Sequence, residues 1–291
     1  MTKKDFSITI LSTRSGMIVI KIGEEFLGLS IQVQGRGRLK MIYITGDCHS
    51  NFERFNTRNF PEQKEMTKDD YVIICGDFGG VWNKDGESKM EASALDWLDG
   101  KSFTTLFVDG NHENFDRLYA YPVEMWHGGK VHKIRPSIIH LMRGQVFELE
   151  GKKIFTFGGA SSHDISAGIL ESDDPKFKLK KKVLDQGWEP YRINHVSWWK
   201  EELPSEEEKQ EGLENLQKYH NEVDFIVTHC CASSTQAIFS DGLYKPDVLT
   251  EYFEKIRQTA RFKKWFFGHY HDNRNVTKDE LLLWEQIIRI S

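Results

Sequence analysis

Short apolar runs that end in a polar turn recur along the chain from residue 41 to residue 269. Each run is four or five residues long and stops at a turn that contains a Gly-Asp, Gly-Asn or His step. Helix-forming sequence follows several of these turns, and this alternation is typical of an α/β fold with parallel strands. The runs predicted to be core strands are Met41–Thr45, Tyr71–Cys75, Thr105–Asp109, Asp224–Thr228 and Lys264–Phe267.

Three further segments have patterns that predict an element. Residues 144–157 alternate between apolar and polar positions around a Glu-Gly-Lys turn, which predicts a β-hairpin. Ser205 and Glu208 match a helix capping box, so a helix is expected to begin at Ser205. The aromatic-rich stretch from residue 281 to residue 288 is expected to be a closing strand of the core.

The chain divides into an N-terminal part and a main domain. Residues 1–40 contain three β-type stretches, Ser7–Leu11, Met17–Ile22 and Phe26–Val33, and are interpreted as a small β-rich extension. The alternatives are a poorly folded extension and sequence that precedes a true start at Met41. Residues 41–291 form the predicted catalytic domain, and residues 158–204 are an insertion without clear periodicity over most of their length.

The insertion contains two groups of side chains with alternative interpretations. Its lysines either face solvent or lie on a flap toward a ligand. Its aromatic residues either form a small hydrophobic cluster or line a binding wall. The lysines are at positions 176, 178, 180, 181 and 182, and the aromatic residues are Trp188, Tyr191, Trp198 and Trp199.

Composition narrows the class of protein. The net charge is −5, so the chain lacks an overall positive field, and a nucleic-acid partner is possible but unsupported. No apolar run has the length of a membrane span, and we expect a cytoplasmic protein without a membrane partner. The four cysteines form no C-x-x-C pair, which indicates reduced thiols rather than a zinc knuckle or a disulfide framework.

Side chains able to bind metal ions follow each predicted core strand. Because ligands bind at the carboxyl ends of strands in open α/β sheets, these side chains are expected to converge. They are too numerous for one tetrahedral ion, but they suit two ions that share a carboxylate. The donors are nitrogen and oxygen without thiolate, which favours manganese, iron or zinc over calcium or magnesium. The candidate ligands are Asp47, His49, Asp77, Asn111, His229, His269 and His271.

The order D-x-H, G-D, G-N-H-E, H and G-H-x-H resembles the calcineurin-like metallophosphoesterase superfamily. The resemblance runs from Asp47 to His271 and implies a four-layer β-sandwich flanked by helices, with the site at the strand ends. It implies that Asp77 bridges two metals and that His112 is a catalytic histidine that binds neither. It assigns Asp47, His49 and His271 to one metal, and Asn111, His229 and His269 to the other.

The second block departs from the Ser/Thr protein-phosphatase branch of that family, because residues 78–82, after Gly76 and Asp77, lack the further carboxylate and the arginine of that branch. They are closer to uncharacterised bacterial members. Arg143 and Arg192 are the candidates for the missing phosphate contact.

The resemblance and the ligand set predict hydrolysis of a phosphate mono- or diester by a metal-activated hydroxide, with Asp77 and His112 as catalytic residues. A nuclease of the same metal chemistry is one alternative. A non-catalytic binding protein that has kept the fold is another. The sequence predicts no oligomeric state.

Overall fold

The computed structural model describes residues 8–12, 18–22, 38 and 40–291. The chain divides into two compact units, Met1–Leu39 and Lys40–Ser291. In the first unit, β1 (Ile8–Ser12) and β2 (Ile18–Ile22) pair as antiparallel strands. They coincide with two of the three predicted β-type stretches, and the third, Phe26–Val33, lies outside the described residues.

One sheet of the second unit has seven strands. They are β3 (Ile42–Thr45), β4 (Tyr71–Ile74), β5 (Thr104–Phe107), β6 (Val123–Trp126), β7 (Gly129–Arg135), β8 (Ile138–Leu141) and β17 (Ile288–Arg289). Their spatial order is β17-β3-β4-β5-β8-β7-β6. The four strands from β3 to β8 in this order are parallel, so three of the predicted core strands end at the same edge.

The other large sheet has six strands. They are β9 (Gln145–Leu149), β10 (Lys152–Phe157), β13 (Phe225–Thr228), β14 (Lys264–Phe267), β15 (Arg274–Asn275) and β16 (Glu280–Leu282). Their order is β15-β16-β14-β13-β10-β9. Strands β9 and β10 form the predicted hairpin, and β13 and β14 confirm the remaining two core strands.

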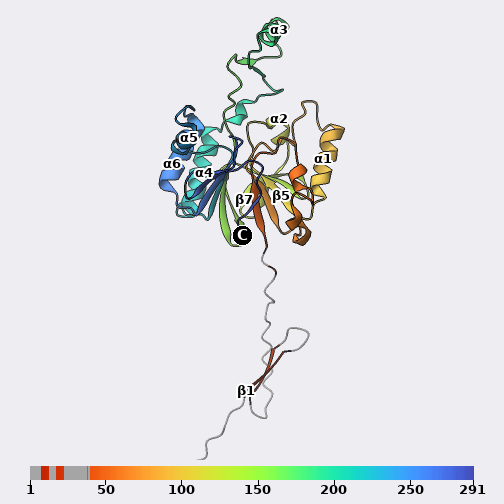
Figure 1. The fold of residues 1–291 in the computed structure, drawn as a ribbon, viewed down its shortest axis with the longest axis vertical. Coiled ribbons are helices and arrows are strands. Elements are labelled where there is room, and N and C mark those ends of the chain that lie inside the picture. Colours follow the sequence, from red (N-terminus) through yellow and green to blue (C-terminus); the bar gives the residue numbers. More distant parts are fainter. Residues whose placement is uncertain (1–7, 13–17, 23–37, 39) are drawn as a thin grey trace, which may run out of the picture. The chain divides into compact units, whose positions relative to one another are not determined.

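Helices cover the outer face of each sheet, as Figure 1 shows. On the seven-stranded sheet lie η1 (Glu53–Phe55), η2 (Pro61–Glu65) and α1 (Lys89–Asp99). On the six-stranded sheet lie α4 (Glu206–Lys218), α5 (Ser233–Ser240) and α6 (Val248–Thr259). The short helix α2 (Phe115–Leu118) follows β5. The capping box predicted at Ser205 is present, and Ser205 caps α4.

The apolar side chains form three layers of core that match this arrangement. Between the sheets, Ile44 and Ile73 of one sheet pack in the same cluster as Ile154 and Val227 of the other. Separate clusters lie between each sheet and its helices. Alternate residues of a strand point to opposite faces, and each of these short strands is buried on both, which explains their nearly continuous apolar sequence. The fold is the predicted four-layer α/β sandwich.

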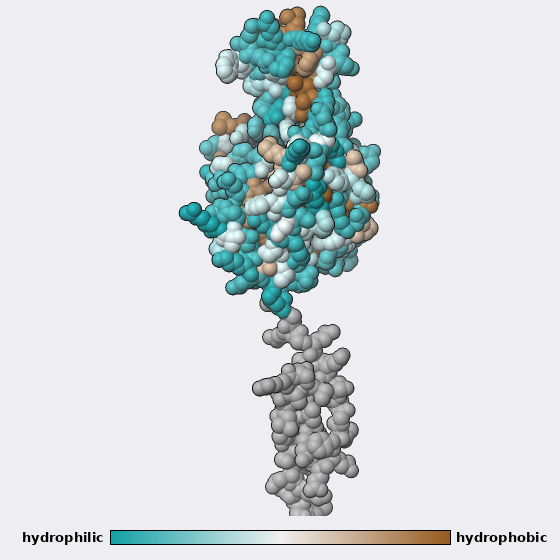
Figure 2. Space-filling model, turned by 90° about the vertical axis from the view of Figure 1, so that its right-hand side faces the viewer, coloured by the Kyte–Doolittle hydropathy of each residue, from teal (hydrophilic) through white to brown (hydrophobic). Residues whose placement is uncertain are grey.

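The insertion contains more regular structure than its sequence indicates. It holds β11 (Ile169–Leu170) and β12 (Arg192–Ile193), which pair in parallel, together with α3 (Phe177–Gly187) and η3 (Lys200–Glu202). Figure 1 shows α3 projecting beyond the sandwich. Leu179, Val183 and Trp188 of the insertion are exposed. Figure 2 shows hydrophobic surface on the projection.

The expectation of one closing strand at residues 281–288 is wrong. Strand β16 pairs with β14 in the six-stranded sheet, whereas β17 pairs with β3 in the seven-stranded sheet. The chain therefore crosses between the sheets at residues 283–287. No helix in residues 40–291 has the length and apolar character that crossing a membrane would require.

Candidate metal centre

The candidate ligands lie in the loops that leave the parallel core strands. Asp47 follows β3, Asp77 follows β4, and Asn111 follows β5 of the seven-stranded sheet. His229 follows β13, and His269 and His271 follow β14 of the six-stranded sheet. The site therefore forms where the carboxyl ends of strands from both sheets meet.

One group of donors consists of Asp47, His49 and His271, whose ligand atoms all lie within 4.8 Å of one another. The Nε2 atoms of the two histidines are 3.0 Å apart. Oδ2 of Asp47 is 3.2 Å from Nε2 of His271 and 3.8 Å from Nε2 of His49. The carboxylate is buried while both imidazoles are partly exposed, so this side of the site opens to solvent.

Asp77 lies between this group and a second, buried group. Its Oδ2 is 3.6 Å from Nε2 of His49, and its Oδ1 is 3.4 Å from Nε2 of His229. Asn111 joins the second group, because its Oδ1 is 3.3 Å from Nε2 of His229. Ligand atoms of Asp47, Asp77 and His229 also lie within 4.8 Å of one another, close enough to share a cation. The two oxygens of Asp77 thus face histidines of different groups.

His269 borders the second group. Its ring centroid is 4.9 Å from that of His229, and its main-chain N–H donates to both carboxylate oxygens of Asp47, at 2.9 and 3.1 Å. Its ring nitrogens belong to none of the donor groups that fall within 4.8 Å among the described residues. The structure therefore brings the His269 ring to the edge of the cluster.

His112 lies beside two of the candidate ligands, His49 and Asp77. It forms a donor group with His49 and Asp77, and its ring centroid is 5.1 Å from that of His49. Burial lowers the pKa of His112, Asp77 raises it, and the charge of Arg192 lowers it, with a net lowering. His112 is therefore favoured as a neutral imidazole, which still offers one N–H donor.

The buried carboxylates require positive charge at the site. Burial alone would raise the pKa of Asp77, but the charge and hydrogen bond of His229 outweigh it and lower the pKa. Burial alone would lower the pKa of His229, but Asp77 and Asp47 raise it to about 10. Buried ionised groups are stable only when paired or bound to metal. The donor set therefore fits divalent cations, which would supply the compensating charge.

Two glycines make room for the carboxylates. A Cβ at Gly110 would collide with the Asp77 side chain, and a Cβ at Gly268 would collide with the Asp47 side chain. Gly110 directly precedes the candidate ligand Asn111, and Gly268 directly precedes His269. Each glycine therefore follows a different strand from the carboxylate that it contacts. The Gly-Asn and Gly-His steps are therefore needed because backbone and carboxylate approach closely here.

Arg143 is not available to a substrate, contrary to the sequence prediction. The residue is buried, and its guanidinium donates to Oδ2 of Asp109 through Nε at 2.8 Å and Nη2 at 2.5 Å. Nη2 also donates to the carbonyl of Glu201 at 2.7 Å. Arg143 therefore joins the strand that precedes the Gly110 loop to the end of the insertion.

Arg192 lies nearer the site, since its charge affects the pKa of His112. However, Nε is 2.9 Å from each carboxylate oxygen of Asp164, and Nη2 is 2.5 Å from Oδ2. The Nε and Nη2 groups of Arg192 already contact Asp164, so these groups could contact a phosphate only if this carboxylate were displaced.

The insertion aromatics have separate roles. Trp199 is buried and donates to Asp116 at 2.7 Å, and its ring contacts Trp82 at 5.8 Å between centroids. Trp82 in turn lies 6.0 Å from the His112 ring. Trp188 is 91% exposed. Trp199 therefore anchors the base of the insertion beside the site, while Trp188 faces solvent.

Arg54 is a site residue that the sequence analysis did not single out. Its guanidinium donates to the carbonyls of Asp47 at 2.5 Å, Gly46 at 3.3 Å and Trp284 at 2.6 Å. These contacts hold the backbone on which the first ligand stands. No local motif marks this role, because the acceptors are main-chain carbonyls, one of them 230 residues away.

Two other side chains support the ligands. Ser162 accepts from Nδ2 of Asn111 at 3.3 Å, which orients the amide oxygen toward His229. The ring of Trp284 stacks on His271 with 5.4 Å between centroids. Ser162 lies 51 positions from Asn111 in the sequence, and no local pattern identifies this contact.

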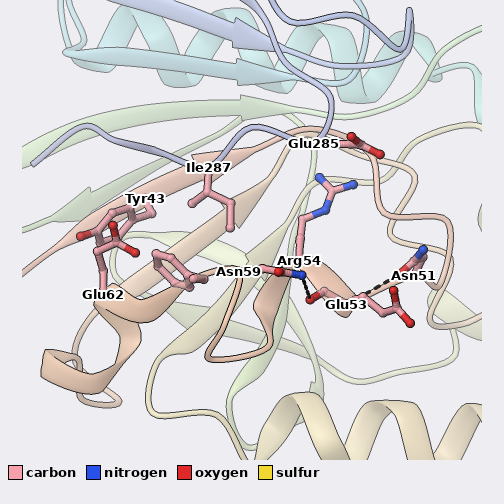
Figure 3. Close-up of a pocket in the computed structure, with 9 residues that line it drawn as sticks. Tyr43, Asn51, Glu53, Arg54, Asn59, Glu62, Glu285 and Ile287 are labelled. Carbon is pink, nitrogen blue, oxygen red and sulfur yellow. Dashed lines mark hydrogen bonds between the residues drawn. The ribbon is translucent and has the colours of Figure 1, made fainter.

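A cavity of about 430 Å³ lies beside Arg54, and Figure 3 shows this side chain extending from η1 toward the chain at Glu285. The carboxylates of Glu53, Glu62 and Glu285 also line the cavity. Their negative charge disfavours a phosphate ester, so the donor cluster around Asp77 rather than this cavity is the candidate functional site.

The fold and the cluster define a metal-dependent phosphoester hydrolase. Residues 40–273 match the model of the calcineurin-like phosphoesterase family, and the chain belongs to that family. This confirms the resemblance inferred from the motif order.

The chain is also similar to lariat debranching enzymes over 45% of its length. It is 29% identical to lariat debranching enzyme A of Xenopus laevis and 26% identical to the enzyme of Danio rerio, over 144 residues each. It is 25% identical to the enzyme of Homo sapiens over 146 residues. The matches cover 26%, 24% and 25% of these relatives, so the chain spans about a quarter of their length.

Proposed function

We propose that the chain hydrolyses a phosphate ester at a dinuclear centre in which Asp77 bridges two cations. The position of Asp77 carries this proposal, because its two oxygens face Nε2 of His229 at 3.4 Å and Nε2 of His49 at 3.6 Å. One cation would be held by Asp47, His49 and His271, and the other by Asn111, His229 and His269.

Bound divalent cations would polarise the phosphoryl group and lower the pKa of a water molecule. The chain's own residues position the reacting groups. Asp77 accepts the main-chain N–H of His112 at 2.8 Å, which holds this imidazole beside the centre. A neutral His112 would donate a hydrogen bond from its one N–H to the leaving oxygen. The nitrogen and oxygen donors favour manganese, iron or zinc.

A phosphodiester is the better substrate for this site than a monoester. A monoester carries up to two negative charges and gains from a guanidinium that contacts its oxygens in pairs. Arg143 is buried against Asp109, and Arg192 is paired with Asp164. Neither guanidinium is free to contact two phosphate oxygens. A diester carries a single negative charge and depends less on such a contact, so it suits this site better.

Metal analysis and two chromogenic esters test the proposal. Purified protein should contain about two divalent ions per chain, and with manganese it should hydrolyse bis-p-nitrophenyl phosphate faster than p-nitrophenyl phosphate. A preference for the monoester would contradict the diester assignment. A protein that binds no metal and hydrolyses neither ester would instead be a binding protein that has kept the fold.

A nuclease of the same chemistry is the second candidate. Helix α3 carries exposed lysines at 178, 180 and 182, with Lys176 at its N-terminal boundary, and the chain partly matches lariat debranching enzymes. A nucleic-acid backbone would contact such a surface with a strong salt dependence. The triple change Lys176→Gln, Lys178→Gln and Lys182→Gln should then weaken binding of a single-stranded oligonucleotide and flatten its dependence on salt. Anisotropy titrations unaffected by these changes would exclude α3 as the contact.

A further inference from the structure

A buried carboxylate at the end of the insertion lies behind the candidate metal centre. Glu202, in η3, is 3% exposed, and both of its carboxylate oxygens accept from Ser162, which lies 40 positions earlier. The main-chain N–H of Ser162 donates to Oε1 at 3.0 Å, and its hydroxyl donates to Oε2 at 2.6 Å. Among the described residues, Glu202 belongs to none of the donor groups. Any effect of Glu202 on a bound cation therefore passes through Ser162.

The hydrogen bonds to Glu202 fix the direction in which Ser162 can act. An ionised carboxylate only accepts hydrogen bonds, so the hydroxyl hydrogen of Ser162 points to Glu202. The hydroxyl oxygen is left as an acceptor, and Nδ2 of Asn111 donates to it at 3.3 Å. Burial raises the pKa of Glu202, while the hydrogen bonds from Ser162 oppose this rise because they favour the ionised form.

The orientation of the Asn111 amide follows from this arrangement. An amide side chain can turn either its oxygen or its NH₂ group toward a cation, and only the oxygen is a metal ligand. With its NH₂ group on Ser162, Asn111 turns Oδ1 to Nε2 of His229 at 3.3 Å. Asn111 is 5% exposed, so solvent offers little alternative to Ser162 as an acceptor. The three residues Glu202, Ser162 and Asn111 therefore form a directed hydrogen-bond chain that ends at the candidate metal centre.

Separate contacts hold the main chain around this hydrogen-bond chain. The N–H of Gly159 donates to the carbonyl of Asp109 at 2.9 Å, in the loop after β5. Nη2 of Arg143 donates both to the carboxylate of Asp109 and to the carbonyl of Glu201 at 2.7 Å. Both ends of the insertion are thus joined to the loop that carries the amide ligand. Groups that orient a ligand are effective only when they are themselves fixed in this way.

We propose that Glu202 is a positioning residue for the cation held by Asn111, His229 and His269, and that it acts by fixing the orientation of the Asn111 amide through Ser162. The proposal rests on the proposed function for the place of this cation. Loss of a group that orients a metal ligand typically lowers metal affinity by about 10–100-fold. The cation held by the other group of ligands should not depend on Glu202.

Glu202→Gln tests the proposal with little change in side-chain size. The new side chain has one acceptor oxygen instead of two, so it cannot accept from both the N–H and the hydroxyl of Ser162. Its NH₂ group can instead donate to the hydroxyl oxygen, which frees the hydroxyl hydrogen to pair with the oxygen of Asn111. The amide oxygen is then drawn away from the cation.

Manganese retention is the measurement. Full-length protein is loaded with manganese and dialysed against decreasing concentrations of the free ion, and bound manganese is counted by elemental analysis. In Glu202→Gln, one ion should need about 10–100-fold more free manganese than in wild-type protein, while the other is retained as before. Glu189→Gln, at an exposed position of the same insertion, is the matched control and should retain both ions as wild-type protein does.

A second change separates orientation from packing. In Asn111→Asp, both side-chain oxygens can bind a cation, so no group is needed to orient them. Adding Glu202→Gln to Asn111→Asp should therefore cause no further loss of manganese. An equal loss with Asn or Asp at position 111 would show that Glu202 acts only through packing and would overturn the proposal. Ser162→Ala removes the hydroxyl, should reproduce the effect of Glu202→Gln, and replaces that variant if it does not fold.

Unchanged retention of both ions in folded Glu202→Gln and Ser162→Ala, or equal weakening of both ions, would also overturn the proposal. Hydrolysis of bis-p-nitrophenyl phosphate is measured on the same samples. A wild-type protein that holds both ions without hydrolysis, and in which Glu202→Gln weakens one, would contradict the proposed function alone. An active wild-type protein in which Glu202→Gln changes neither ion would contradict the positioning role alone. A wild-type protein that binds no manganese would contradict both.

Discussion

The main-chain N–H of His112 donates a 2.8 Å hydrogen bond to Oδ1 of Asp77. This bond joins the loop after β5 to the loop after β4, so the candidate catalytic imidazole and the candidate bridging carboxylate move together. The same Oδ1 faces His229 at 3.4 Å. Asp77 therefore organises the protein side of the site as well as contributing charge to it, which leads to the first prediction.

Asp77→Asn should lose bound metal and reduce hydrolysis of bis-p-nitrophenyl phosphate by about 100-fold or more, because an amide removes the negative charge that two cations would share. Metal content and kcat are the measurements. Asp85→Asn, at an exposed loop position, is the matched control and should keep both values. Full metal content in Asp77→Asn would contradict the bridging role.

His112→Ala should retain metal and lose turnover by about 10²–10³-fold, the range for removal of one hydrogen-bond donor that stabilises developing charge. Metal content and turnover should respond differently because, in the proposed mechanism, His112 donates to the leaving group while other residues hold the cations. Normal turnover would remove His112 from the mechanism. Loss of metal together with turnover would instead make His112 a ligand, as its grouping with His49 and Asp77 allows.

Gly110→Ala should destabilise the protein by about 1–3 kcal/mol, because the added methyl group collides with Asp77. It should also weaken metal binding, since the carboxylate has to move. Thermal unfolding and metal titration check both effects. Gly100→Ala is the control, because its Cβ meets only ordinary contacts and its backbone is helical. Equal melting temperatures for the two variants would refute the steric argument.

Arg143→Met should lower the free energy of unfolding by about 3–5 kcal/mol, because it leaves the buried carboxylate of Asp109 without its cation. Urea denaturation measures the change. The exposed pair of Arg261 and Glu222 offers a control, and Arg261→Met should change stability by about 1 kcal/mol or less. If Arg143→Met were stable and changed only KM, the original assignment of Arg143 to the substrate would be correct.

His132 should make the protein less stable in mild acid. Burial, followed by the charge of His140, lowers the pKa of His132 to about 4, although Asp109 raises it. Nδ1 of His132 is 3.0 Å from Nδ1 of His140, and Tyr119 contacts the ring. The unfolded chain binds the proton more readily, so this stability is complete above about pH 6.5 and is lost as the pH falls toward 4.

His132→Asn should therefore flatten the dependence of unfolding free energy on pH between about 6.5 and 4. His220→Asn is the control, because His220 is exposed and its positive φ of 56° is one that Asn tolerates. Parallel pH profiles for wild-type protein and His132→Asn would show that His132 does not cause the acid sensitivity.

Periodicity and turn chemistry were sufficient to predict the local elements. The apolar runs before Asp47 and Asp77 became buried parallel strands, and the capping box at Ser205 became the start of α4. These features depend on neighbouring residues: a buried strand needs a short apolar run, and a helix start needs side chains that accept its free N–H groups. The recurrence of polar residues at strand exits also predicted that the ligands converge.

Tertiary structure decided which distant groups became partners. Arg143 was assigned to phosphate from residue type alone, but strand order places it beside Asp109, whose buried charge binds the guanidinium. The segment after residue 280 divides between two sheets for a similar reason, since pairing depends on which strand edges are open. Local sequence determines an element, but burial and neighbouring strands determine what its side chains contact.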